Sequence, residues 1–377
     1  MTMVRSGLLL AAALALANPA RADALLDEAV AFSGQVAFLA SGAPGLVIAA
    51  VRDGETAFAG FGETARGSGV APTAETMMRV ASISKAVCGD VLASLVAEGT
   101  VSLSAPLQDY LPEGFAVPEK DGRALRFIDA ATQTSGLPRE MAQTGGTPEN
   151  PYAGHTLAAM QAAMNADPFL FAPGTGALYS NLGFDMLGLG IAGAAGKPYA
   201  EVLAERVLEP RGMADTVFNP RPGDEGRLMQ GHGPDGTPLP FVPTPTTMEC
   251  ASGLYTTPAD MLKWIAWHLA EGGPDAERRA IDHAAWVQRD GLAVAIGLDD
   301  GGGQMASMAL GWVMVAPDGD HPAYLHKSGG RQGMLTYVAI APSRGIGVFA
   351  AINQFSTTGF TEMVDRANKL IFQLAPR

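Results

Sequence analysis

Two residues in the first quarter of the chain could carry out nucleophilic chemistry. Ser82 and Lys85 lie three positions apart at the start of a predicted helix, and such positions share one helix face. A serine hydroxyl is a poor nucleophile until a base removes its proton, and a partly desolvated lysine has a pKa low enough to help. Backbone N–H groups at a helix start can bind a developing oxyanion. The spacing is compatible with acyl transfer, but also with a surface lysine behind a helix cap.

Two later segments carry groups that could complete such a site. Tyr179 and Asn181 precede another predicted helix, so a phenol and an amide project from one turn. A tyrosine beside a lysine can move a proton between a nucleophile and a leaving group. Segment 327–330, with the sequence KSGG, ends a predicted strand and offers a cation, a hydroxyl and a backbone along which a substrate could lie. Each segment alone is also compatible with a structural role.

The order of these motifs resembles that of a known enzyme superfamily. S-x-x-K, Y-x-N and K-[ST]-G follow one another as in the serine β-lactamases and low-molecular-mass penicillin-binding proteins, and the tyrosine form resembles the class C branch. The stretches TSGLPRE at 134–140 and LGWVMVAP at 310–317 are most similar to the AmpH-type D-alanyl-D-alanine carboxypeptidase/endopeptidases. The resemblance covers nearly the whole chain after residue 22.

The resemblance implies a role for each catalytic side chain. Ser82 resembles the acylated nucleophile, and Lys85 resembles its proton acceptor. Tyr179 resembles the group that protonates the departing amine and later activates water, and Lys327 would steady the tyrosinate. The backbone N–H groups of Ser82 and Gly330 would form the oxyanion hole.

The resemblance also implies the substrate-binding residues. Asn181 would hold the substrate amide, Ser328 would bind the substrate carboxylate, and the Gly329–Gly330 backbone would lie against the substrate. Arg331 stands where small or hydroxyl residues are usual, and a guanidinium there could bind a peptide carboxylate in a bidentate manner. A solvated loop charge is the alternative interpretation of Arg331.

Two further departures from the family pattern leave the proton carriers in place. Gln133 replaces a histidine that often precedes Thr-Ser-Gly, and Ser328 replaces the commoner threonine. The resemblance therefore still predicts hydrolysis through an acyl-enzyme, most closely that of a D-alanyl-D-alanine carboxypeptidase/endopeptidase on peptidoglycan peptides. A class C-like β-lactamase, an S-x-x-K esterase and a non-turnover penicillin-binding sensor remain as alternatives.

Other site chemistries have little support in the sequence. No serine lies in a G-x-S-x-G frame, so a Ser-His-Asp hydrolase is not indicated. The six histidines show no HExxH or other metal-binding spacing, and we predict neither a metal nor a cofactor. His326 adjoins Lys327 but should point to the opposite face of an alternating strand, so we interpret it as non-catalytic.

Hydrophobic patterns predict an α+β fold with the sheet built from the two ends of the chain. Two apolar runs predict a hairpin at 45–51 and 56–61, and others predict strands at 310–315, 323–327, 335–341 and 347–352. A helix is predicted at each end of the chain, at 25–40 and 361–374. The middle of the chain predicts helices at 81–97, 156–166, 184–195, 199–207 and 258–270. This pattern indicates an antiparallel sheet that is flanked by the terminal helices and carries an inserted, mostly helical domain. The family resemblance implies that this is the β-lactamase/transpeptidase-like architecture.

The same pattern predicts where the domains begin and end. Residues 23–80 and 305–377 should form the sheet domain, and residues 81–304 the helical domain with its active-site loops. Residues 1–22 resemble a secretory signal peptide, with Arg5, an apolar run over 7–17 and the Ala20-Arg21-Ala22 cleavage signal. Because that run is too short to cross a bilayer, we expect a periplasmic protein without a transmembrane segment.

Composition and cysteine usage limit the partners. The net charge of −13 opposes binding to nucleic acid or to anionic lipid. The family resemblance implies stem peptides or β-lactams as the ligands. The oligomeric state is not indicated. Cys88 and Cys250 could pair in an oxidising compartment, or each could act as a small buried hydrophobe, and the sequence does not decide between these states.

Overall fold

An eight-stranded antiparallel sheet forms the centre of the molecule. The computed structural model describes residues 23–142, 145–147 and 150–375, so the predicted signal peptide lies outside the described residues. The strand order is β2-β1-β12-β11-β10-β9-β8-β6. The strands are β1 (Gly45–Arg52), β2 (Glu55–Gly62), β6 (Val287–Gln288), β8 (Ser307–Met308), β9 (Val313–Val315), β10 (Tyr324–Arg331), β11 (Met334–Ala341) and β12 (Ile346–Ile352).

The two ends of the chain meet in the middle of this sheet. β1 pairs with β12 from Leu46 opposite Ile352 to Arg52 opposite Ile346. Side chains of β1 alternate between two cores because successive residues of a strand point to opposite faces. Val47 belongs to the core beneath the helical segment, whereas Leu46 belongs to the core on the other face.

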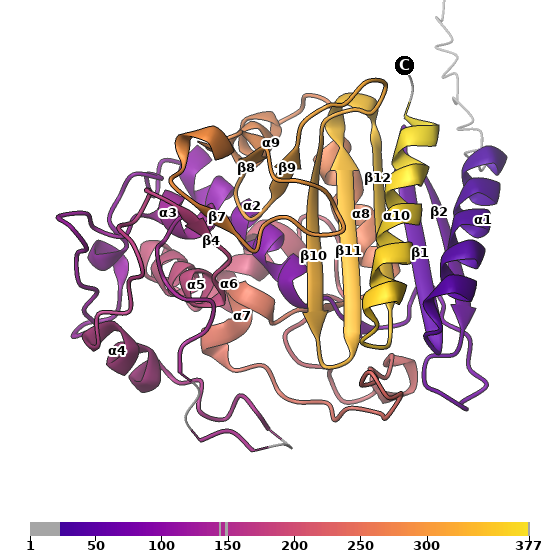
Figure 1. Cartoon of the computed structure of the whole chain (residues 1–377), viewed down its shortest axis with the longest axis horizontal. Coiled ribbons are helices and arrows are strands. Elements are labelled where there is room, and N and C mark those ends of the chain that lie inside the picture. Colours follow the sequence, from indigo (N-terminus) through magenta and orange to yellow (C-terminus); the bar gives the residue numbers. More distant parts are fainter. Residues whose placement is uncertain (1–22, 143–144, 148–149, 376–377) are drawn as a thin grey trace, which may run out of the picture.

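Two long helices cover that other face. Helices α1 (Ala24–Ser41) and α10 (Thr357–Leu374) pack side by side on the sheet (Figure 1). Among the described residues, α1 is the one helix that is long and apolar enough to cross a membrane, yet Leu26, Val30 and Ala37 bury its inner side against the sheet. An amphipathic helix of this kind gains its stability from packing.

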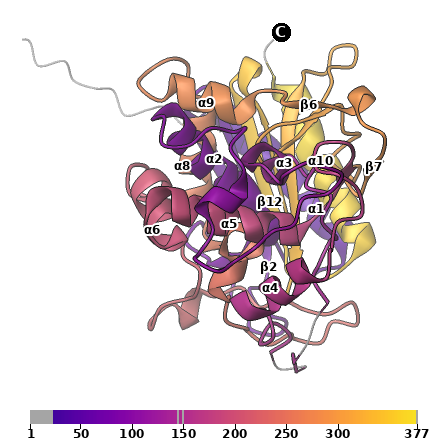
Figure 2. The same ribbon diagram turned by 90° about the vertical axis from the view of Figure 1, so that its left-hand side faces the viewer.

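The middle of the chain packs on the opposite face of the sheet, and Figure 2 views the molecule from the side of these helices. They are α2 (Ser84–Ala97), α3 (Phe127–Ala131), α4 (Leu157–Asn165), α5 (Asn181–Ala195), α6 (Tyr199–Leu203), α7 (Glu249–Ser252), α8 (Pro258–Leu269) and α9 (Ala276–His283). Two small sheets connect loops of this segment, and they pair β3 (Met78–Arg79) with β5 (Tyr255–Thr256) and β4 (Ala177–Leu178) with β7 (Ala295–Ile296).

Several predicted elements differ from the structure. The run 310–315 is not one strand, because Gly311 has φ +79° and turns the chain between β8 and β9. The predicted strand 323–327 continues as β10 to Arg331, so KSGG lies within the strand and does not end it. The helix predicted at 81–97 begins with a 3-10 turn, Ala81–Ile83, before α2.

Short elements account for the remaining differences. The helix predicted at 199–207 becomes a π-helix after Leu203, and α9 was not predicted. β6 adds residues 287–288 to the sheet, although the predicted boundary assigns them to the helical domain. The division of the chain into two domains stays a prediction.

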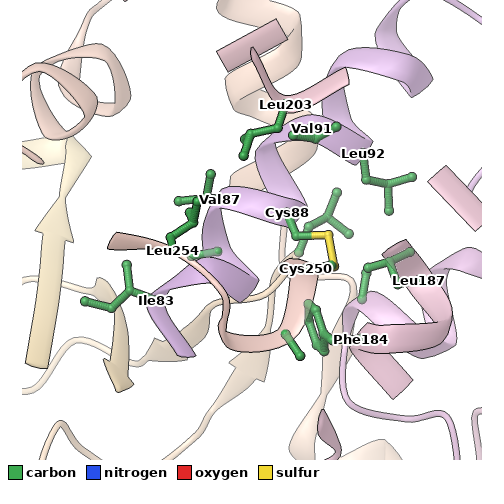
Figure 3. Packing of buried hydrophobic residues seen from close by; sticks show 14 of the residues in the cluster. Ile83, Val87, Cys88, Val91, Leu92, Phe184, Leu187, Leu203, Cys250 and Leu254 are labelled. Atoms are coloured by element: carbon green, nitrogen blue, oxygen red, sulfur yellow. A yellow bond between two sulfur atoms is a disulfide. The ribbon is translucent and has the colours of Figure 1, made fainter. Parts of the chain in front are cut away.

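A disulfide joins two helices of the middle segment. Cys88 in α2 is bonded to Cys250 in α7, across a sequence separation of 162 residues. The bond lies among buried apolar side chains, including Phe184 and Leu187 of α5 (Figure 3). The structure thus resolves the question that the sequence left open, in favour of a paired state.

This disulfide should contribute substantially to stability. Replacing both cysteines by alanine (Cys88→Ala with Cys250→Ala) should lower the free energy of unfolding by about 2–5 kcal/mol, because the bond closes a long loop in the unfolded chain. Chemical denaturation of both proteins without reductant measures the difference. Adding a reductant should move the midpoint of the wild type but not that of the variant. Equal free energies of unfolding for the two proteins would contradict the expectation.

Candidate active site

Ser82 lies in a turn that its neighbours hold in an unusual conformation. The residue before it, Ala81, has φ +50°, a region that side chains other than glycine rarely occupy. Ser84 fixes the turn, since its hydroxyl donates to the Ala81 carbonyl (2.7 Å) and accepts from the Leu254 N–H (3.1 Å). The nucleophile candidate is therefore held at the junction of the 3-10 turn and α2.

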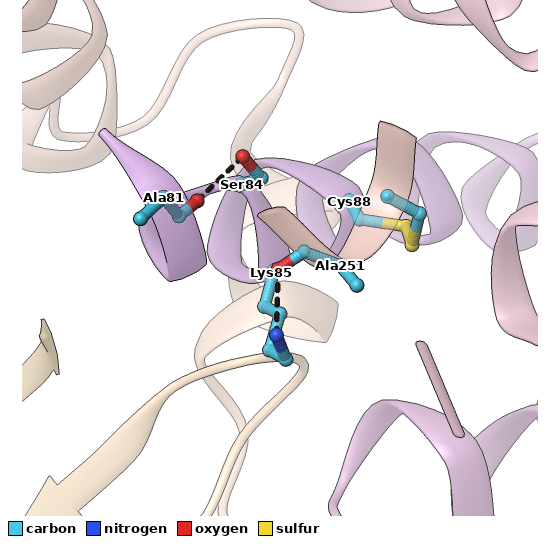
Figure 4. The surroundings of a disulfide bond; sticks show 6 residues. Ala81, Ser84, Lys85, Cys88 and Ala251 are labelled. Carbon is cyan, nitrogen blue, oxygen red and sulfur yellow. Dashed lines mark hydrogen bonds between the residues drawn. A yellow bond between two sulfur atoms is a disulfide. The ribbon is translucent and has the colours of Figure 1, made fainter. Parts of the chain in front are cut away.

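Lys85 is fully buried and donates to three oxygens from different segments. Its Nζ lies 3.3 Å from the Ser82 hydroxyl, 2.5 Å from Asn181 Oδ1 and 2.6 Å from the Ala251 carbonyl (Figure 4 shows the last contact). Burial lowers the pKa of Lys85, although the nearby Tyr179 opposes this shift. The spacing of Ser82 and Lys85 on one helix face thus brings the amine to the hydroxyl, as predicted.

Tyr179 lies among three cations. The Lys327 Nζ is 4.9 Å, the Lys85 Nζ 5.2 Å and the Arg139 guanidinium 4.7 Å from the centre of its ring. Burial alone would raise the pKa of the phenol, but the charges of Lys327 and Lys85 and a hydrogen bond with Ser82 outweigh it and lower the pKa to about 7. A phenol with this pKa can both accept and donate a proton near neutral pH.

Gln133 positions the turn that carries Tyr179. Its side-chain oxygen accepts from the Ser180 N–H (2.6 Å), and its carbonyl accepts from the Leu178 N–H (2.9 Å). Ser180 in turn caps α5, because its hydroxyl accepts from the Gly183 N–H (2.9 Å). The residue that replaces the family's histidine therefore orients the second motif.

The third motif borders the site with an open strand edge. In the described part of the chain, β9 pairs with β10 only from Tyr324 to His326. On that side the backbone from Lys327 to Arg331 has no partner strand, so an extended substrate could add to it. A side chain at Gly329 would lie 2.3 Å from the Val80 carbonyl and 3.1 Å from the Ser82 nitrogen, so only glycine permits this close approach.

The structure excludes one of the two interpretations of Arg331. Its side chain is only 6% exposed, which excludes a solvated loop charge. The guanidinium lies 3.7 Å from the centre of the Tyr152 ring and donates to the Ser252 hydroxyl. The binding of a substrate carboxylate by Arg331 stays a prediction.

His326 lies on the other face of β10 from Lys327, as the alternation predicts. It is fully buried, and its ring lies 5.7 Å from that of Tyr337 in the neighbouring strand. Burial lowers the pKa of His326 to about 4. It is a neutral core residue and does not line the site.

Three potential metal ligands meet elsewhere in the molecule. His268, Asp282 and His283 bring their donor atoms within 4.8 Å of one another. The charges of Arg211 and Arg278 act on Asp282 and His268 there, which opposes the binding of a cation. None of these three residues is among the described contacts of Ser82.

Several residues of the site had no usable signal in the sequence. The Ala251 contact to Lys85 uses a backbone carbonyl, which any residue could supply. Arg139 was noted only as part of a family stretch, and Asp300, which accepts a 2.5 Å hydrogen bond from the Ser328 hydroxyl, belongs to an ordinary turn sequence. The residues predicted from the three motifs do converge around the Lys85 amine.

Comparison with known proteins places this chain in one family. The sequence matches the Beta-lactamase family over residues 22–372, so the chain belongs to that family. It is 33% identical over 343 residues to the D-alanyl-D-alanine-carboxypeptidase/endopeptidase AmpH of Escherichia coli strain K12, covering 90% of this chain and 86% of the relative.

Solved structures show the same fold. The β-lactamase/D-alanine carboxypeptidase from Yersinia pestis superposes with a TM-score of 0.85 at 32% identity, covering 94% of this chain and all of that chain. The D-alanine carboxypeptidase AmpC from Burkholderia cenocepacia, at 21% identity, superposes with a TM-score of 0.75 over 93% of this chain and 99% of its own. At that identity the second likeness concerns the fold alone.

The close contact at Gly329 can be tested by adding one methyl group. Gly329→Ala should push β10 away from Ser82 and slow acylation by a penicillin about 10²-fold, because small displacements of reacting groups are costly. Gly330→Ala should cost less, since its nearest neighbour is the flexible end of Leu335 at 3.1 Å. Labelling rates with a fluorescent penicillin measure both variants. Equal labelling rates for the two variants would contradict the expectation that the close approach of Gly329 to Ser82 matters for acylation.

Proposed function

We propose that this protein is a serine hydrolase that acts through an acyl-enzyme on D-alanyl-D-alanine peptides of peptidoglycan. The observation that carries the proposal is the buried Lys85 amine, which contacts Ser82 and lies beside Tyr179 and Lys327. A hydroxyl, an amine of lowered pKa and a phenol of lowered pKa are the groups that acylation of a serine requires. The AmpH relative supports the choice of substrate.

The proposed acylation moves one proton and exchanges one bond. Ser82 Oγ attacks the carbonyl carbon of the scissile amide, while its proton passes to the Lys85 and Tyr179 pair. The N–H groups of Ser82 and Gly330 stabilise the oxyanion, each donor contributing about 3 kcal/mol. Tyr179 then gives a proton to the departing amine, and the C–N bond breaks to leave an ester on Ser82.

Deacylation repeats the sequence with water. Tyr179 accepts a proton from water, which attacks the ester carbonyl, and the proton returns to Ser82 Oγ as the acid product leaves. Lys327 stabilises the tyrosinate in both steps, since its amine lies near the ring. Asn181 would orient the substrate amide, and the open edge of β10 would bind the peptide backbone.

An exported, periplasmic location is part of this proposal. The segment 1–22 has the pattern of a signal peptide, and the Cys88–Cys250 bond is of a kind that persists in oxidising compartments. Peptidoglycan lies in that compartment, so the substrate and the enzyme would meet there.

Turnover of two substrates tests the proposed function. The purified protein should release D-alanine from a murein pentapeptide faster than it hydrolyses a chromogenic cephalosporin. Ser82→Ala should abolish both reactions and all covalent labelling by a penicillin, because the hydroxyl on which the ester forms is lost. Faster cephalosporin turnover would identify a β-lactamase instead, labelling without turnover would identify a penicillin-binding sensor, and labelling of the variant would exclude Ser82 as the nucleophile.

The pH dependence of acylation tests the role of Tyr179. If the phenolate accepts the proton, kcat/KM should rise as the pH increases through about 7, because the phenolate fraction grows there. Tyr179→Phe should lower kcat/KM about 10²-fold or more and remove that rise. Tyr152→Phe, a change at another phenol, which contacts Arg331, should retain it. An unchanged pH profile in Tyr179→Phe would assign the proton transfer to another group.

A further inference from the structure

The hydroxyl that is expected to bind a substrate carboxylate, that of Ser328, donates its hydrogen bond to an acidic side chain, that of Asp300. Asp300 Oδ2 accepts a 2.5 Å hydrogen bond from Ser328 Oγ, in the motif that borders the open edge of β10. The family resemblance assigns Ser328 the task of donating this same hydrogen bond to the carboxylate of the substrate. In this chain the Ser328 hydroxyl already donates to the carboxylate of Asp300.

The turn that carries Asp300 is fixed to the sheet. Asp300 Oδ1 accepts from the Gly302 N–H (2.7 Å), so both carboxylate oxygens are held. The Gly302 carbonyl accepts from the Tyr324 hydroxyl (2.6 Å) and from Asn368 Nδ2 (3.4 Å). A side chain at Gly302 would meet the His326 ring at 2.3 Å, so the turn lies directly on β10. Asp300 is therefore held at Ser328 by contacts with β10 and α10.

The charge at this position acts against one class of substrate. A carboxylate that approached Ser328 would meet the Asp300 carboxylate within a few ångströms, and like charges at that distance repel each other appreciably even in a partly solvated site. A carboxamide at the same place carries no charge and can donate its N–H to Asp300. The 31% exposure of the Asp300 side chain leaves it accessible to such a group.

We propose that Asp300 is a specificity-determining residue. It disfavours substrates with a free carboxylate beside the scissile bond, and it favours substrates in which the carboxyl group of the leaving residue is amidated or absent. This inference rests on the proposed function and narrows its substrate class. Interior or amidated peptide bonds would be better substrates than free D-alanyl-D-alanine termini, which the enzyme would still hydrolyse, but more slowly.

A matched pair of peptides tests the proposal. The substrates are diacetyl-L-lysyl-D-alanyl-D-alanine and its C-terminal carboxamide, which differ only in the charge beside the scissile bond. Asp300→Asn should raise kcat/KM for the free acid about tenfold, because it removes the repulsion between the two carboxylates. The new amide can also donate to Ser328 Oγ, which leaves the serine hydroxyl free to donate to the substrate carboxylate. The value for the carboxamide should stay within about twofold, because this uncharged group is not repelled by the carboxylate and can still donate its N–H to the side-chain oxygen of the variant.

Asp299→Asn provides the control in the same turn. Asp299 pairs with Arg289 through contacts of 2.6 and 2.8 Å and does not contact Ser328, so its loss should leave the acid-to-amide ratio of kcat/KM unchanged. A parallel change of both substrates in Asp300→Asn would show that Asp300 acts only by holding the turn, and an unchanged ratio would likewise overturn the proposal.

A second measurement separates failure of this inference from failure of the proposed function. If the wild type hydrolyses neither peptide, the peptidase function fails, and acylation rates with benzylpenicillin and its methyl ester still test Asp300. Asp300→Asn should then accelerate labelling by the free acid about tenfold relative to the ester. An unchanged ratio in this measurement would also reject the role of Asp300.

Discussion

The burial of one amine is the constraint on which the other parts of this site depend. Lys85 has no exposed surface, and an ammonium in such a place is costly unless acceptors surround it. The acceptors come from the start of its own helix, from Asn181 at the start of α5 and from the Ala251 carbonyl in α7. Segments that are distant along the chain must therefore pack around one atom, and the same packing brings Tyr179 close enough for its pKa to fall.

Features with a strong local or motif signal could be predicted from the sequence. The convergence of Ser82, Lys85, Tyr179 and Lys327 followed from the order of three motifs, each of which has a chemical reason for its spacing. The hairpin of β1 and β2 followed from two apolar runs around an Asp-Gly turn, and the helical stretch predicted at 25–40 corresponds to α1. Helix α10 followed from apolar residues on the side that packs on the sheet. His326 was correctly placed away from the site by strand alternation alone.

The features that were missed depend on contacts between distant residues. Strand β6 has only two residues, and it exists because β8 offers a free edge. Helix α9 has a charged sequence, and the side chains that it buries are those of Arg279 and Asp282. It therefore lacks the apolar pattern from which a helix can be predicted. The run 310–315 was apolar throughout, and only the positive φ of Gly311 divides it. Asp300 reaches Ser328 because Tyr324, Asn368 and His326 fix its turn, and none of these residues is near it in sequence.

The bond between Cys88 and Cys250 has a consequence for how the protein withstands cleavage. It encloses most of the middle segment in a covalent ring, from α2 to the segment whose carbonyl accepts from the Lys85 amine. A protease that cut the backbone once between these cysteines would open the ring without releasing a fragment. Both pieces would stay tethered at the point where α2 meets α7, so a nicked molecule would keep its serine and its lysine's acceptors in one covalent body.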